Sequence, residues 1–89
     1  MGLNYPNRSR TFDAAKGIIR FWGYDRVIEV SFFLETAALR KLIPETSAGE
    51  LDILELFDAV RDRIHQVADK VYFRRPKGSY RCDLVAEDF

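Results

Sequence analysis

The sequence predicts an α+β fold in which a small antiparallel sheet packs on one short helix and one long helix. Three observations predict it: helical periodicity over residues 51–75, two β-rich segments joined by a turn over 18–33, and an alternating segment at 79–85. The expected order is β-β-β-α-α-β, with an N-terminal strand, a hairpin and a C-terminal strand. The chain has 89 residues and is 47% hydrophobic, so a single domain over 1–89 is expected.

The N-terminal half is expected to supply three strands. Leu3–Tyr5 is a short candidate strand, because Pro6 cannot donate to a ladder and favours extended geometry in the residue before it. Asn7–Phe12 carries Arg8 and Arg10 among turn-forming residues, and Asp13–Gly17 is expected to be a connection. Ile18–Trp22 and Val27–Phe33 are rich in β-branched and aromatic residues, and residues 23–26 supply a turn between them, which predicts a hairpin.

Both faces of that hairpin are apolar. Ile19 and Phe21 lie on one side of its first strand, and Ile18 and Trp22 lie on the other. In an antiparallel sheet with one face exposed to solvent, hydrophobic and polar residues alternate more regularly along each strand. We therefore expect the second face of the hairpin to be covered by the N-terminal segment or by another subunit. Small domains rarely leave a large apolar patch bare, which favours cover by the N-terminal segment.

Two helices are expected next. Glu35 or Thr36 begins a short helix that Pro44 ends. Residues 47–50 (Ser-Ala-Gly-Glu) match a capping box, in which Ser and Glu side chains satisfy backbone N–H groups at a helix start. Leu51–Arg75 then follows as one helix of roughly 24 residues, about 36 Å long. Its apolar stripe comprises Ile53, Leu54, Phe57, Val60, Ile64, Val67, Ala68, Val71 and Tyr72.

The last strand is expected at Ser79–Val85. Tyr80, Cys82 and Leu84 would face the core, while Arg81 and Asp83 point outward. Cys82 is the only cysteine, so no internal disulfide can form, and it is expected to behave as a small core hydrophobe. The lone cysteine, the polar start of the chain and the lack of a long apolar run predict a soluble, cytoplasmic protein with no membrane association.

The charges balance at 14 basic and 14 acidic residues, which argues against a dedicated nucleic-acid or membrane-surface module. Acidic residues predominate over 45–69 and basic residues over 70–81. Such an order complements a helix macrodipole, which is a sufficient structural explanation. The alternative is a basic patch that binds nucleic acid or a phosphate ligand, and its candidate residues are Arg8, Arg10, Arg74, Arg75 and Lys77.

One flank of the long helix carries Asp58, Asp62, His65 and Asp69 at steps of four, three and four. Carboxylates and imidazole can hold a divalent metal, but a straight helix spreads these groups over about 16 Å. We therefore interpret the flank as a solvated acidic face, with His65 as a partly buried neutral imidazole, and expect no metal and no cofactor.

Arg61 is the anomaly of the helix, because it falls inside the apolar arc. A guanidinium there must extend to solvent or meet a carboxylate, since an unpaired buried charge is very costly. The candidate partners are Glu29, Asp13, Asp88 and the C-terminal carboxylate. The structural interpretation is a salt bridge that pins the fold, and the functional one is an anion-binding Arg between helix and sheet.

The chain also resembles a family of short bacterial proteins. The segments that carry the resemblance are Y-P-N-R-S-R-T-F-D, I-R-F-W-G-Y-D, E-V-S-F, A-L, F-D-A-V-R-D-R-I-H-Q-V-A and S-Y-R-C-D-L-V-A-E-D-F, in that order. The family is domain-of-unknown-function family 1488. The resemblance implies a compact α+β fold and no activity. Its most recognisable positions correspond here to Phe57, Arg61, Ile64, Ala68 and Asp88-Phe89.

No phosphate-binding loop, nucleophile elbow, zinc spacing or helix-turn-helix signature is present in the sequence. The leading hypothesis is a non-enzymatic interaction or regulatory protein that self-associates as a homodimer through the apolar hairpin surface. The alternative is the nucleic-acid or phosphate-ligand binder described above. A third hypothesis, an enzyme, would use Arg61 and His65 with Asp88.

Overall fold

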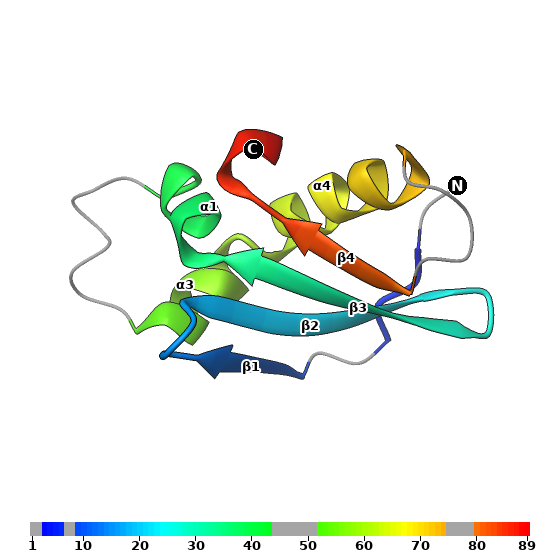
Figure 1. The fold of residues 1–89 in the computed structure, drawn as a ribbon, viewed down its shortest axis with the longest axis horizontal. Helices are drawn as coiled ribbons and strands as arrows, with labels where there is room; N and C mark the ends of the chain where they lie inside the picture. Colours follow the sequence, from blue (N-terminus) through cyan, green and yellow to red (C-terminus); the bar gives the residue numbers. More distant parts are fainter. Residues whose placement is uncertain (1–2, 7–8, 44–51, 75–79) are drawn as a thin grey trace.

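Four strands form one sheet in the order β1-β2-β3-β4 (Figure 1). The computed structural model describes residues 3–6, 9–43, 52–74 and 80–89. Its elements are β1 (Arg10–Asp13), β2 (Ile18–Asp25), β3 (Ile28–Glu35), α1 (Thr36–Lys41), α3 (Ile53–Ala59), α4 (Arg61–Arg74), β4 (Arg81–Leu84) and the 3₁₀ helix η1 (Ala86–Asp88). The predicted α+β class and the order of strands and helices are confirmed.

β2 and β3 form the predicted hairpin, but it is longer than expected. The strands pair antiparallel from Ile18↔Glu35 to Asp25↔Ile28, so the loop shrinks to Arg26 and Val27. Arg26 adopts a left-handed φ of 61°, which a tight two-residue hairpin loop requires at its first position. Residues 23–25, which were expected to form the turn, instead continue the strand.

The two faces of the sheet differ sharply. We call the inner face the side that carries Ile19, Phe21, Val30, Phe32, Leu34, Cys82 and Leu84, all of which are at most 1% exposed. We call the outer face the opposite side, formed by Thr11, Asp13, Ile18, Arg20, Trp22, Tyr24, Glu29, Ser31, Phe33, Glu35, Arg81 and Asp83. Along β2 and β3 the outer-face residues are half-buried or exposed.

β4 lies beside β3 and runs parallel to it, with Phe32 opposite Cys82 and Leu34 opposite Leu84. The sheet is therefore mixed, and the prediction of a wholly antiparallel sheet is wrong in this respect. The helices separate β3 from β4, and a connection of that length permits the parallel pairing that a tight hairpin turn forbids. Cys82 is buried as predicted, whereas Tyr80 is 57% exposed and precedes the strand.

The first strand is not Leu3–Tyr5. Asn4 makes only an isolated bridge to Tyr24, and the strand that pairs with β2 is β1, in a stretch for which turn-forming residues and a connection were predicted. Tyr5 instead packs on the inner face, where its ring centroid lies 6.4 Å from that of Phe21 and 6.2 Å from that of Phe32. The described residues 3–6 therefore lie on the inner side and do not cover the outer face, although the N-terminal segment was expected to cover it.

The predicted long helix is broken at Val60, which has φ −119° and ψ 20°. Its backbone N–H turns back to the carbonyl of Phe57, and α4 begins at Arg61. The break lets α3 pack beside β1 and α4 beside β4. α3 starts with Asp52, whose carboxylate accepts a hydrogen bond from the Glu55 N–H at 2.9 Å. The predicted capping box at 47–50 lies outside the described residues.

The core combines the inner face with one side of each described α-helix. Its helical members are Ala38, Leu39, Leu56, Phe57, Ile64, Ala68 and Val71. α1 begins at Thr36 with Glu35 as its N-terminal cap, within the range predicted. Within the part of the chain that the structure describes, no helix is long and apolar enough to cross a membrane.

Candidate functional site

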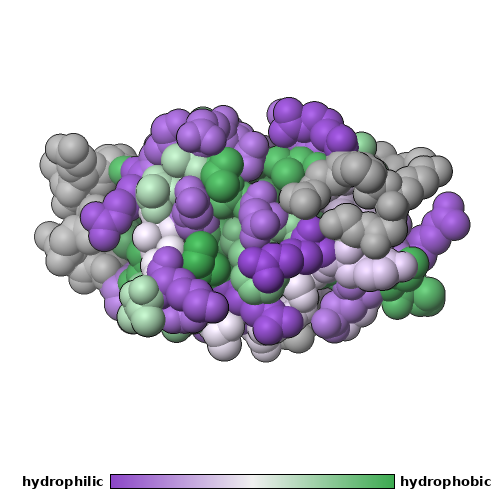
Figure 2. All heavy atoms as spheres, in the orientation of Figure 1, coloured by the Kyte–Doolittle hydropathy of each residue, from purple (hydrophilic) through white to green (hydrophobic). Residues whose placement is uncertain are grey.

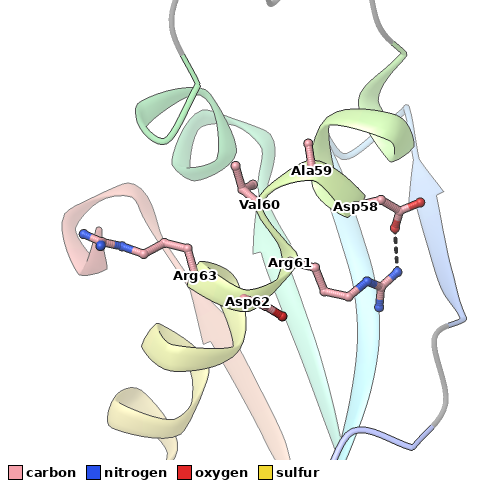
Figure 3. A pocket seen from close by; sticks show the side chains of 6 residues that line it. All are labelled: Asp58, Ala59, Val60, Arg61, Asp62 and Arg63. Atoms are coloured by element: carbon pink, nitrogen blue, oxygen red, sulfur yellow. Dashed lines mark hydrogen bonds and ion pairs between the residues drawn. The ribbon is translucent and has the colours of Figure 1, made fainter.

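Arg61 lies where the sequence placed it, inside the apolar side of the helix, and it is 6% exposed. Its guanidinium donates a hydrogen bond to Oδ1 of Asp58 across the helix break (Figure 3). The guanidinium carbon also lies 5.0 Å from the ring centroid of Phe57, within the range of a cation–π contact. The buried charge is therefore held by a carboxylate and an aromatic ring from the preceding helix.

Asp58 joins this pair to the sheet, because it also receives two hydrogen bonds from Arg10 of β1. Arg10 Nε lies 3.1 Å from Oδ1, and Nη2 lies 2.8 Å from Oδ2. Burial alone would raise the pKa of the Asp58 carboxyl, but the hydrogen bonds and charges of Arg10 and Arg61 outweigh it and hold the pKa below its usual range.

The partner of Arg61 is thus none of those predicted, which were Glu29, Asp13, Asp88 and the C-terminal carboxylate. Asp58 precedes Arg61 by three residues, a spacing at which opposite charges meet on a helix. The signal was present in the sequence. It was missed because Asp58 was assigned to the solvated acidic flank.

The surface beside this pair is hollowed by about 470 Å³, and the hollow is lined by the six consecutive residues 58–63. Figure 3 shows the side chains of Val60 and Arg63 directed away from the Asp58–Arg61 ion pair. Ligand sites are normally enclosed by several elements whose polar groups converge, and this one is a notch along a single stretch of chain. Arg61 and Asp58 therefore have a structural role here, because their ion pairs link β1, α3 and α4.

His65 makes a different contact. Its ring stacks on Tyr5, with centroids 3.7 Å apart and planes inclined by 4°. The Tyr5 hydroxyl donates to Asp69 Oδ1 at 2.7 Å, and burial, followed by the Asp69 hydrogen bond, raises the pKa of Tyr5. A Cβ atom on Gly23 would lie 2.7 Å from the Tyr5 ring, so the bare glycine backbone makes room for that ring. Together these contacts hold the N-terminal segment on α4.

Asp88 makes its hydrogen bond within the C-terminal turn and not with Arg61 or His65. Its Oδ2 accepts a hydrogen bond from the Val85 N–H at 3.0 Å, which caps η1. A second hollow of about 590 Å³ is lined by Asn4, Tyr5, Pro6, Tyr24 and Arg26. Neither of the two hollows includes His65 or Asp88 in its lining, so the structure does not bring the three residues of the enzyme hypothesis together in one of them.

The predicted basic residues are spread over the molecule. Arg10 lies on β1 at one edge of the sheet and is paired with Asp58. α4 packs near β4 at the other edge of the sheet (Figure 1). Arg74 ends α4, and its Nε donates to the Lys70 carbonyl. Arg8, Arg75 and Lys77 lie outside the described residues.

The acidic flank does not form a metal site among the residues that the structure describes. Asp58 and Asp69 are engaged by Arg10, Arg61 and Tyr5, as described above. The helix break at Val60 also separates Asp58 from the other three members of the flank.

The outer face is the feature whose role the sequence left open. Arg20 on β2 has its guanidinium carbon 5.0 Å from the ring centroid of Trp22 and 5.5 Å from that of Phe33. Arg81 on β4 lies 4.0 Å from the same Phe33 ring. Two arginines therefore flank the half-buried Phe33, and Arg20 also donates to the Ser31 hydroxyl at 3.3 Å.

Acidic side chains surround this cluster on the outer face. They are Asp13, Glu29, Glu35 and Asp83, against the two basic residues Arg20 and Arg81. Asp83 lies 3.4 Å from Arg81, and Glu29 accepts a hydrogen bond from the Tyr24 hydroxyl at 3.1 Å. Figure 2 shows hydrophobic patches separated by hydrophilic residues, so the visible surface is not one continuous apolar patch.

Comparisons with known proteins agree with this fold. Residues 3–81 match the family described as protein of unknown function, DUF1488. The chain is similar to a crystal structure of a DUF1488 protein of unknown function from Shewanella loihica PV-4, with a TM-score of 0.62, 17% identity and 90% of each chain covered. None of the curated proteins matches the chain. The match to the family extends over most of the sequence, and the chain therefore belongs to the DUF1488 family.

Proposed function

We propose that this protein is a non-enzymatic interaction protein whose contact surface is the outer face of the sheet, and that a second copy of the chain is its partner. One observation carries the proposal. Trp22 and Phe33 lie on the outer face beside Arg20 and Arg81, while the described helices contribute their apolar residues to the core on the inner face. The proposal places the protein in the bacterial cytoplasm, where the Cys82 thiol stays reduced.

The composition of this surface supports a protein partner. Aromatic residues and arginine are enriched at the centres of protein interfaces, and the aromatic rings supply a large contact area with few rotatable bonds to fix. Arg20 and Arg81 are already stacked on rings, so part of their conformational entropy is lost before a partner arrives. The backbone beneath them is paired on both sides, because β2 and β3 are the two central strands.

Nucleic-acid binding is the less favoured function. A sheet with exposed aromatic residues can stack bases, but the phosphate backbone is held mainly by basic side chains. The outer face carries four acids against two arginines, and these acids would repel phosphates. Of the basic residues predicted for this role, Arg10 is engaged by Asp58.

Sedimentation velocity over a series from low micromolar to near-millimolar protein tests the proposal. We expect the wild-type mass to rise with concentration and the variant Phe33→Ser to remain monomeric. Phe73→Ser is the matched control, because Phe73 is a 54% exposed phenylalanine on α4, and it should associate as the wild type does. A wild-type protein that stays monomeric throughout would contradict the proposal.

Sedimentation also tests the alternative function, nucleic-acid binding. A labelled single-stranded oligonucleotide of mixed sequence is sedimented with the protein at low salt, where electrostatic binding is strongest. We expect no shift of the oligonucleotide. A shift that Phe33→Ser abolishes and Phe73→Ser retains would instead assign the outer face to nucleic acid.

A further inference from the structure

We infer that the second copy docks face to face about a two-fold axis parallel to β3, so that Arg20 of each copy forms an ion pair with the partner's Asp83. The inference rests on the proposed function and specifies the geometry of the contact. It follows from how the strand register arranges charge and aromatic side chains in rows across the outer face.

The register defines two such rows at the centre of the face. In the first, Arg20 of β2 lies opposite Phe33 of β3, and Phe33 lies opposite Asp83 of β4. In the second, Trp22 of β2 lies opposite Ser31, and Ser31 lies opposite Arg81. Each row therefore has β3 at its middle and chemically complementary groups at its two ends.

A two-fold axis that runs along β3, in the plane of contact, exchanges the β2 side of one copy with the β4 side of the other. Arg20 then meets the partner's Asp83, and Trp22 meets the partner's Arg81, while Phe33 packs on its own symmetry mate. Each of these contacts therefore occurs twice, once from each copy, as a closed isologous contact requires. The strands of the two sheets run in similar directions, which is the aligned mode of sheet packing.

The ion pairs within one copy favour an axis along β3 over an axis that runs across the strands. An axis across the strands would place Arg81 opposite the partner's Asp83 and leave Arg20 opposite Trp22. Arg81 already lies 3.4 Å from Asp83 of its own chain, whereas Arg20 has no ion pair among the residues that the structure describes. The axis along β3 is the one that gives Arg20 a carboxylate.

Two acids near the ends of β3 limit the strength of the contact. Glu29 and Glu35 would approach the partner's equivalent residues, and like charges repel. Both carboxylates are directed sideways by hydrogen bonds in their own chain, Glu29 from the Tyr24 hydroxyl and Glu35 from the Ala86 N–H at 3.3 Å. The twist of the two sheets also separates their outlying parts.

The area of the face sets the expected affinity. The three strands that this axis brings into contact, two of eight residues and one of four, span roughly 330 Å² of flat sheet, at about 3.4 Å per residue and about 4.8 Å between strands. That is below the value of about 800 Å² per partner that standard specific interfaces bury, and it is in the range of weak, transient contacts. We therefore expect a weak, reversible dimer that forms at micromolar or higher concentration.

Charge reversal tests the pairing. Arg20→Asp and Asp83→Arg should each raise the dimer dissociation constant by about tenfold or more, because each change places two like charges opposite one another. The double variant R20D/D83R should return the constant to within about threefold of the wild type, since the pairs are restored with exchanged signs. Circular dichroism on every variant verifies that the fold is retained.

The variant R81D/D83R discriminates between the two axes. It would restore association if the axis ran across the strands, and it should stay impaired if the axis runs along β3, because Arg20 would then meet an arginine. Rescue by R81D/D83R without rescue by R20D/D83R would overturn the inference. A dimer that is indifferent to all four variants would overturn it too but leave the proposed function standing, whereas a monomeric wild type would contradict both.

A cross-linking measurement is independent of charge. Ser31 lies on β3, so the axis brings it close to the partner's Ser31. Ser31→Cys should be cross-linked to a dimer by a short bis-maleimide, whose spacer spans the about 10 Å between packed sheets, much faster than Thr11→Cys, an exposed residue of the same face on β1. Cys82 is buried and should not compete. Equal rates for the two variants would contradict the axis along β3.

Discussion

β3 presents two different surfaces within one strand. Val30, Phe32 and Leu34 are fully buried on the inner face, whereas Ser31 and Phe33 between them are half-buried on the outer face. Phe32 stacks on Phe21 within the core, with ring centroids 5.0 Å apart, while Phe33 stacks under arginines. The two-residue period of a strand thus separates residues that stabilise the fold from residues available for contact with a partner.

The sharpest test of this difference substitutes the two neighbouring phenylalanines. Phe32→Ala should lower the free energy of unfolding by about 3–5 kcal/mol, because it removes buried area and leaves a cavity. Phe33→Ala should lower it by about 1 kcal/mol, since its ring is only half-buried. Urea unfolding measures both, and equal losses would contradict the distinction between the faces.

Asp58 tests how the helices are fastened to the edge of the sheet. Asp58→Asn should cost about 1–2 kcal/mol near pH 7, a value reduced from that of a fully buried pair because the Asp58 side chain is 38% exposed. The pKa of this carboxyl is lowered in the folded protein, so its stabilising contribution is present above the unfolded pKa of about 4 and is lost as the pH falls through the folded value.

The urea midpoint measured at several pH values between 6 and 2 distinguishes this effect, with Asp62→Asn, which removes an exposed carboxylate on α4, as the control. Wild type and Asp62→Asn should lose more stability on acidification than Asp58→Asn does. Parallel curves for all three proteins would show that Asp58 does not couple protonation to folding.

Gly23 tests the close contact of the N-terminal segment with the inner face. Gly23→Ala should destabilise the protein by about 1–3 kcal/mol, because its Cβ would lie 2.7 Å from Tyr5 and 3.3 Å from Phe32. The cost should shrink in the background of Tyr5→Ala, where the closest obstacle is gone. A double-mutant cycle by urea unfolding measures the coupling, and strict additivity would argue against this contact.

Tyr72 is expected to give the smallest effect. Its hydroxyl donates to Asp25 near the tip of the hairpin at 2.7 Å, and that hydrogen bond, followed by burial, raises the pKa of Tyr72 to about 12. Tyr72→Phe should cost about 1 kcal/mol at neutral pH. Because the folded pKa lies above the unfolded value of about 10, the contribution is present below pH 10 and is lost between pH 10 and 12.

Alkaline denaturation of wild type and Tyr72→Phe checks this prediction. The difference in stability between them should vanish as the pH approaches 12. If the difference in stability between the two proteins stays constant from pH 10 to 12, the hydrogen bond from the Tyr72 hydroxyl to Asp25 does not contribute to stability as described.

The sequence predicted the elements whose periodicity is unbroken. β-branched and aromatic residues marked the hairpin, and alternation marked Cys82 and Leu84 as inward-facing in β4. β1 was missed, because Arg-Thr-Phe-Asp is a mostly exposed edge segment without an apolar pattern. β1 is held by pairing with β2 across residues 14–17 and by the contact of Arg10 with Asp58, 48 positions away, and local propensity encodes neither.

The helix break at Val60 could not be found from periodicity. Val60 continues the apolar stripe, and neither glycine nor proline marks the end of α3. The break is set by packing, with α3 beside β1 and α4 beside β4. Arg61 was recognised as anomalous, yet its partner depends on that break and on Arg10 reaching Asp58 from another element.

The candidate contact surface was only half predictable. The sequence showed that both faces of the hairpin carry apolar side chains, but not which face the N-terminal segment covers. That choice depends on Tyr5 fitting over Gly23 and stacking on His65, a contact between residues 60 positions apart. Once the segment lies on the inner face, Trp22 and Phe33 are left at the surface.

Trp22 offers the most direct measurement of the central claim, because it is the only tryptophan in the chain and lies on the outer face. Its fluorescence emission maximum is recorded over a concentration series, with Phe33→Ser as the non-associating comparison. If a second copy covers the outer face, the wild-type emission should shift to shorter wavelength as concentration rises, in step with the sedimentation mass. Association without any change in Trp22 emission would contradict the claim that the outer face is the contact surface.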